Sequence, residues 1–77
     1  MNRQSIGIRI ANVREEMRMT QTDLAHRSGI SQSHISRLES GNRGVRIATL
    51  RQIAWALNVE MPRLLGSEDG RGASSAS

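Results

Sequence analysis

The sequence predicts an all-α domain, a compact bundle of five short helices. Apolar residues recur at helical spacing along most of the chain, and no stretch alternates apolar and polar residues as a strand does. Ser or Thr precedes three of these stretches and Gly follows three, which are residue types that begin and end helices. A chain of 77 residues is long enough for one small domain and too short for two.

The first helix is expected to begin after Ser5, which can cap it, and to bury one apolar stripe. The stripe consists of Ile6, Ile10, Val13 and Met17. Thr20 opens a second, shorter helix, because a hydroxyl cap followed three residues later by Asp23 fits a capping box. Gly29 ends this helix, since the residue after a helix end usually has a left-handed conformation.

Three more helices are expected after this turn. Ser31 caps a helix over residues 32–40, and a longer helix extends from about residue 47 to residue 58. Their inward faces carry Ile35 and Leu38 in the first case, and Leu50, Ile53, Ala54 and Leu57 in the second. A last helix over residues 61–65 has Pro at its start and Gly after its end.

The basic charge belongs to the folded part of the chain. Eleven Arg, no Lys and seven acidic residues give a net charge of +4, and residues 1–66 alone carry +5. Residues 67–77 have no apolar side chain larger than Ala and are expected to form a disordered polar tail, which leaves residues 1–66 as the domain. The basic balance points to nucleic acid or another acidic partner.

Several classes of protein are excluded. The chain has no Cys, which rules out disulfides and thiolate metal sites and fits a reducing, cytosolic setting. No apolar run reaches membrane-spanning length, and the first ten residues do not resemble a signal peptide. His26 and His34 lack further ligands nearby, so no metal is expected. Glu15 and Glu16 have no accompanying nucleophile or pocket, so neither catalysis nor a cofactor is expected.

The segment from Gln21 to Gly41, QTDLAHRSGISQSHISRLESG, joins two unusually short helices through a glycine turn. A helix-turn-helix requires this arrangement, because the second helix must project into a DNA major groove while the first braces it. The crossing of the two helices also requires a small residue, here Ala25, and an unrestricted turn residue, here Gly29.

This segment resembles the phage repressor and Cro type of helix-turn-helix, the lambda-repressor-like class. The matching positions are Gln21, Leu24-Ala25, Gly29, Ile35-Ser36-Arg37-Leu38-Glu39, Thr49-Leu50, Ile53-Ala54 and Ala56-Leu57-Asn58-Val59. The resemblance covers roughly residues 6–65, and residues 39–47 most resemble restriction–modification controller proteins. It implies a bacterial or phage transcription regulator that acts in the cytoplasm at the nucleoid.

The resemblance and the helical faces together assign expected roles. Gln32, Ser33 and Arg37 are expected to read bases, since Gln can bond adenine and Arg can bond guanine in the major groove. The alternative is a merely solvated polar face. The resemblance also implies that an ion pair between Arg14 and Glu39 holds the recognition helix in place, without contacting DNA.

A second group of residues is expected to bind the phosphates of the DNA backbone. It comprises Gln21, Ser31, His34, Ser36, Asn42, Arg43 and Arg46. Gln21 lies in the first turn of its helix, where free N–H groups attract anions. Arg46 stands where many relatives have a Ser or Thr cap, and a phosphate could offset the unfavourable cation at that helix end. The alternative for Arg46 is a loose surface charge.

A homodimer is expected because Trp55, the one aromatic residue, falls on the outer face of its helix. The expected interface comprises Trp55, Met61, Leu64 and Leu65. Such a dimer would place two recognition helices about 34 Å apart on a palindromic operator. The partners are therefore double-stranded DNA and a second copy, with RNA polymerase as a partner if the protein activates transcription. Two alternatives remain: an antitoxin that also regulates its own promoter, and the detached DNA-binding half of a larger repressor.

Overall fold

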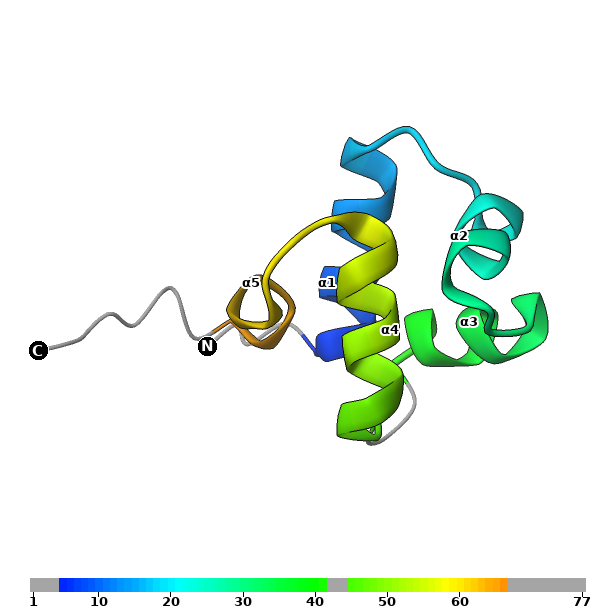
Figure 1. Ribbon diagram of the computed structural model, residues 1–77. Helices are drawn as coiled ribbons and strands as arrows, with labels where there is room; N and C mark the ends of the chain where they lie inside the picture. Colours follow the sequence, from blue (N-terminus) through cyan, green and yellow to red (C-terminus); the bar gives the residue numbers. More distant parts are fainter. Residues whose placement is uncertain (1–4, 42–44, 67–77) are drawn as a thin grey trace, which may run out of the picture.

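Five helices make up the computed structural model, which describes residues 5–41 and 45–66 and confirms the all-α prediction. The helices are α1 (Ile6–Glu16), α2 (Gln21–Ser28), α3 (Gln32–Glu39), α4 (Ile47–Leu57) and α5 (Met61–Leu65) (Figure 1). None of the helices within these ranges is long and apolar enough to cross a membrane. The expected tail over residues 67–77 lies outside the described residues.

The caps at the starts of the first three helices and the turn at Gly29 form as the sequence predicts. The hydroxyl oxygens of Ser5 and Ser31 each accept the N–H of the residue three positions later, at 3.2 Å. Thr20 and Asp23 form a complete capping box, in which the Asp23 N–H donates to Thr20 Oγ1 at 3.0 Å and the Thr20 N–H donates to Asp23 Oδ2 at 2.9 Å. Gly29 follows α2 with a left-handed φ of 76°, a conformation that costs glycine little.

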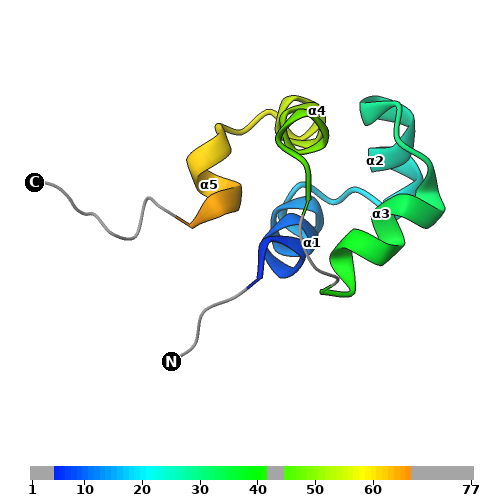
Figure 2. The same cartoon turned by 90° about the horizontal axis from the view of Figure 1, so that it is seen from below.

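The core is aliphatic and lies where the helices meet. Its buried side chains are Ile10, Val13, Leu24, Ile30, Ile35, Leu38, Leu50, Ile53, Ala54, Ala56, Leu57 and Leu64. α1 packs against α3 and α5, whereas α2 packs against α3 and α4. Figure 2 shows α1 in the middle, with α4 above it, α5 on one side and α3 on the other. This arrangement leaves α3 and α4 on different sides of the molecule.

Two apolar residues differ from their expected environments. Met17 was expected to complete the buried stripe of the first helix, but α1 ends at Glu16 and Met17 is exposed. Leu64 was expected in the dimer interface, but it is completely buried in the core of its own chain. The interface prediction is wrong for Leu64, because a side chain without exposed surface has nothing to offer a second copy.

Gly7 allows α1 and α3 to approach closely. A Cβ atom at this position would overlap the carbonyl oxygen of Leu38 and would lie 2.9 Å from its carbonyl carbon. Because these atoms belong to the α3 backbone, they cannot rotate away as a side chain could. Gly7 therefore sets the distance between the first helix and the end of α3.

Candidate nucleic-acid interface

The two faces of α3 differ in polarity. Ile35 and Leu38 are buried against the rest of the bundle, whereas all three predicted base-reading residues are exposed. These are Gln32, Ser33 and Arg37. α2 lies above α3 in Figure 1 and packs against it, as the first helix of a helix-turn-helix does. The exposed face therefore offers amide, hydroxyl and guanidinium groups on one short helix.

Glu39, the one acidic residue of α3, is turned inward. Its Oε2 accepts a hydrogen bond from Arg14 Nε at 2.7 Å, and its Oε1 accepts one from Arg14 Nη2 at 3.0 Å. Hydrogen bonding to this carboxylate raises the pKa of Arg14 above its usual value. The ion pair that the family resemblance implies is therefore present and partly buried. As a result, no carboxylate of α3 competes with a phosphate or a base edge for Arg37.

Gln21 connects the start of α2 to the same carboxylate. Its Nε2 donates to Glu39 Oε1 at 3.0 Å in a half-buried position, a contact that the sequence did not predict. An amide nitrogen carries two hydrogens, so this bond fixes the side chain and leaves one N–H for an external acceptor. The capping box uses the backbone N–H of Asp23. The backbone N–H groups of Gln21 and Thr22, also in the first turn, have no acceptor within the helix and can donate to an anion.

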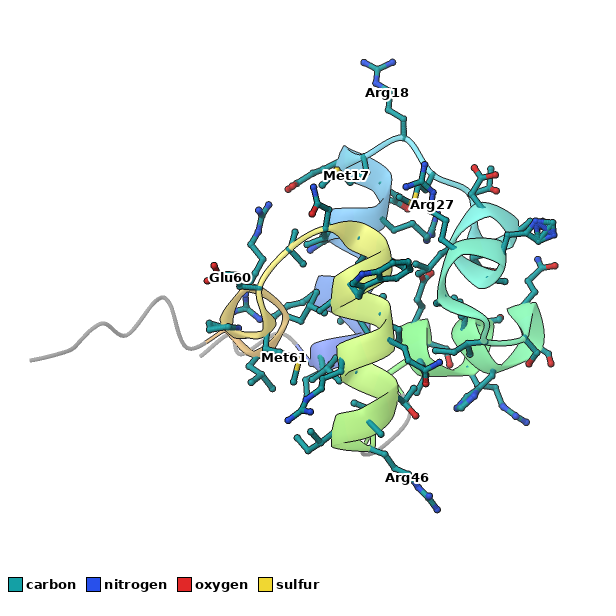
Figure 3. The ribbon with its side chains drawn as sticks, in the orientation of Figure 1. Met17, Arg18, Arg27, Arg46, Glu60 and Met61 are labelled. Atoms are coloured by element: carbon teal, nitrogen blue, oxygen red, sulfur yellow. The ribbon has the colours of Figure 1, made fainter. Side chains whose placement is uncertain are left out.

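The other predicted phosphate ligands have different surroundings. Ser31 and Ser36 are exposed and His34 is half-buried, all on or next to α3. Arg46 precedes α4 and forms no side-chain cap, and Figure 3 shows its side chain extending from the start of α4 away from the bundle. Asn42 and Arg43 lie outside the described residues.

A hydrogen bond from α4 holds the turn of the helix-turn-helix. Gln52 Nε2 donates to the carbonyl oxygen of Ser28 at 3.1 Å, and the buried Ser28 hydroxyl accepts the N–H of Ile30 at 3.2 Å. The first bond satisfies one of the carbonyl groups that a helix leaves unpaired at its end. Sequence analysis missed this contact, since Gln52 and Ser28 are 24 positions apart. The turn before α3 is thus held by one hydrogen bond within the turn and by another from α4.

The described residues hold no group of three or more His, Cys, Asp or Glu that could bind a metal ion.

Comparisons with known proteins agree with this geometry. The model of the helix-turn-helix family matches residues 10–64. An uncharacterised HTH-type transcriptional regulator, y4dJ of Sinorhizobium fredii, is 37% identical over 67 residues, which are 87% of this chain and 87% of that protein. The transcriptional repressor RghR of Bacillus subtilis is 40% identical over 63 residues, which cover 80% of this chain but only 47% of RghR.

Solved structures give the same result. The restriction–modification controller protein C.AhdI of Aeromonas hydrophila superposes with a TM-score of 0.73 at 30% identity, over 77% of this chain and 89% of that one. SinR, a master regulator of biofilm formation solved in complex with DNA, superposes with a TM-score of 0.74 at 30% identity. That match covers 78% of this chain and 97% of the SinR chain.

Proposed function

This chain belongs to the helix-turn-helix family and is a DNA-binding transcription regulator, and we propose that it binds a two-fold symmetric operator as a homodimer. It acts by occupancy, without catalysis, in the cytoplasm at the nucleoid. Bound over a promoter, the dimer excludes RNA polymerase; bound upstream of one, it can contact the polymerase.

The exposed polar face of α3 is the observation that supports this function most strongly. Arg37 is assigned to a guanine, whose O6 and N7 a guanidinium can bond together, and Gln32 to an adenine. Ser33 lies on the same face and contacts the neighbouring base edge. Because Glu39 is bound to Arg14 and Gln21, this face carries positive charge without a competing carboxylate.

Phosphate contacts on both sides of the groove position α3. Gln21 is assigned to one strand, since its amide is fixed by Glu39 and has an N–H to spare. Arg46 is assigned to the other strand, together with Asn42 and Arg43 of the preceding segment. Ser31, His34 and Ser36 add contacts near α3. These contacts fix the register and orientation of the protein but do not specify the sequence.

The homodimer is assigned to an apolar surface that excludes Leu64. Leu65 is 44% exposed, Ile47 is 56% exposed, and Met61 is half-buried against the core. Exposed apolar side chains of this size are suited to contact with a second copy. In a two-fold contact, each subunit presents the same side chains to the other. Such a contact places two recognition helices on one face of the DNA.

The salt dependence of binding to duplex DNA tests this function. Six or more phosphate contacts per dimer predict that affinity falls by about 10³-fold or more between roughly 50 and 200 mM salt. Fluorescence anisotropy with a labelled duplex measures this slope. An affinity that stays constant over that range contradicts nucleic-acid binding.

A further inference from the structure

A surface groove lies outside the proposed DNA interface, between the last turns of α2 and α4. It has a volume of about 370 Å³ and is lined by Arg27, Trp55, Ala56 and Asn58. No residue of α3 or α5 lines it. Trp55, which was expected in the dimer interface with Met61 and Leu65, forms one wall of this groove.

Trp55 is the most exposed large apolar side chain of the described residues, with 76% of its surface accessible. It lies nine residues after Arg46, which corresponds to about 13 Å along α4. Figure 2 shows α4 and α3 on different sides of the bundle, so DNA bound to the outer face of α3 leaves the outer face of α4 uncovered. The indole is thus available to another molecule while the protein is on DNA.

Arg27 supplies a cation that no carboxylate of the described residues contacts directly, although its charge acts on Asp23 one turn earlier and helps to lower the pKa of that carboxyl group. Among the described residues, the Arg27 guanidinium forms neither a hydrogen bond nor an ion pair. Asp23, one turn earlier, already accepts a hydrogen bond from Thr20. No residue that lines the groove carries a carboxylate, and α4 contains no acidic residue. The groove therefore combines a guanidinium that forms no hydrogen bond or close ion pair with the described residues, an exposed indole and the amide of Asn58.

We propose that this groove binds a partner protein, through a segment in which a carboxylate side chain stands next to an apolar one. The carboxylate pairs with the Arg27 guanidinium, which can donate two parallel hydrogen bonds. The apolar side chain covers the indole of Trp55 and the methyl group of Ala56. Trp and Arg are among the residues that contribute most to binding at protein interfaces. An open groove suits a protein surface better than a small molecule, because pockets for small molecules enclose most of their ligand.

Two other occupants fit these observations less well. Single-stranded nucleic acid stacks successive bases on several aromatic side chains, whereas this chain has one. A second copy related by two-fold symmetry about the groove would bring Arg27 near the Arg27 of that copy, and none of the residues that line the groove supplies a carboxylate to separate these like charges. A carboxylate from a different protein avoids both problems.

Because Trp55 is the only Trp, its fluorescence reports on this groove alone. The probes are a capped hexapeptide of alternating Glu and Leu and a matched peptide of alternating Lys and Leu. We expect the Glu-Leu peptide to shift the emission to shorter wavelengths with saturation, and the Lys-Leu peptide to have no effect. Arg27→Ala should weaken binding of the Glu-Leu peptide at least tenfold, and Arg27→Glu should reverse the preference. Arg63→Ala is the matched control and should bind like the wild type, since Arg63 lies on α5 and pairs with Glu16.

Four results would overturn the proposal. The first is no saturable shift with either peptide, and the second is an equal shift with both, which would indicate unspecific apolar contact. The third is a shift that depends on protein concentration alone, which would assign the groove to a second copy. The fourth is a shift with single-stranded DNA that Arg27→Ala abolishes, which would assign it to nucleic acid.

Discussion

Arg14 and Glu39 form a two-pronged ion pair that joins α1 to the end of α3. The two hydrogen bonds measure 2.7 and 3.0 Å, and the exposed fractions of the two side chains are 11% and 6%. Arg14 Nη1 also donates to the carbonyl oxygen of Met19 at 2.7 Å, and Gln21 donates to Glu39. One carboxylate therefore holds the start of α2 and the end of α1 against the recognition helix.

Replacing Glu39 by Ala should strongly destabilise the fold, because the largely buried Arg14 guanidinium would lose its partner. Removal of one member of a buried ion pair costs about 3–5 kcal/mol. Chemical denaturation of the wild type and variant measures the change. Glu16→Ala is the matched control, since it breaks an exposed pair with Arg63 and should cost about 1 kcal/mol or less. Equal changes in both variants would contradict the structural role of Glu39.

Gly7→Ala should destabilise the protein by about 3 kcal/mol, because the added methyl group collides with the α3 backbone at Leu38. Gly29→Ala is a useful comparison. Its Cβ would meet no atom within 4 Å, so only the left-handed φ of 76° opposes it, at roughly 1–2 kcal/mol. Thermal unfolding of both variants shows which one is destabilised more, and we expect it to be Gly7→Ala. A Gly7→Ala variant as stable as the wild type would mean that α1 and α3 are further apart than described.

The capping box of α2 should contribute to the acid sensitivity of the fold. Hydrogen bonds from the backbone and side chain of Thr20 lower the pKa of Asp23 below its ordinary value of 3.8. The unfolded chain therefore binds this proton more readily, so the stabilisation is complete above about pH 4 and declines as the pH falls further. Asp23→Ala should be less stable at neutral pH and should lose less stability between about pH 4 and pH 2. An unchanged acid profile would exclude this contribution.

The capped helix starts and the inward faces of α2, α3 and α4 could be predicted from the sequence because they depend on neighbouring residues. Thr20 and Asp23 are three positions apart, and their capping box formed as expected. Leu64 could not be distinguished from Leu65, because a helix of five residues is too short for periodicity to define a buried face. Met17 continued an apolar stripe beyond the point where α1 ends.

The contacts that hold the candidate interface could be predicted only where family resemblance supplied them. The pair of Arg14 and Glu39 came from that resemblance. The bond from Gln52 to Ser28 and the close approach at Gly7 depend on how distant segments cross, which no local pattern encodes. The groove at Trp55 likewise requires Arg27 of another helix, although the exposure of Trp55 itself was predicted correctly.

The dimer should depend on Leu65 and not on Trp55. Leu65→Glu places a charge in the proposed apolar contact and should weaken self-association at least tenfold, because burying an unpaired carboxylate is costly. Trp55→Ala should leave self-association unchanged, since Trp55 lines a different surface. Analytical ultracentrifugation over a range of concentrations compares the variants. If Trp55→Ala weakens self-association and Leu65→Glu does not, the dimer interface contains Trp55 and the assignment to Leu65 is wrong.

The central claim is that the outer face of α3 reads base pairs, and the affinity of Arg37→Ala for two duplexes tests it most directly. One duplex is selected by the wild type from a random pool, and the other has a scrambled sequence. Loss of Arg37 should cost about 1–3 kcal/mol on the selected duplex and little on the scrambled one, whereas Arg46→Ala should weaken both alike. The claim is contradicted if Arg37→Ala weakens both duplexes equally, or if the wild type selects no sequence from the pool.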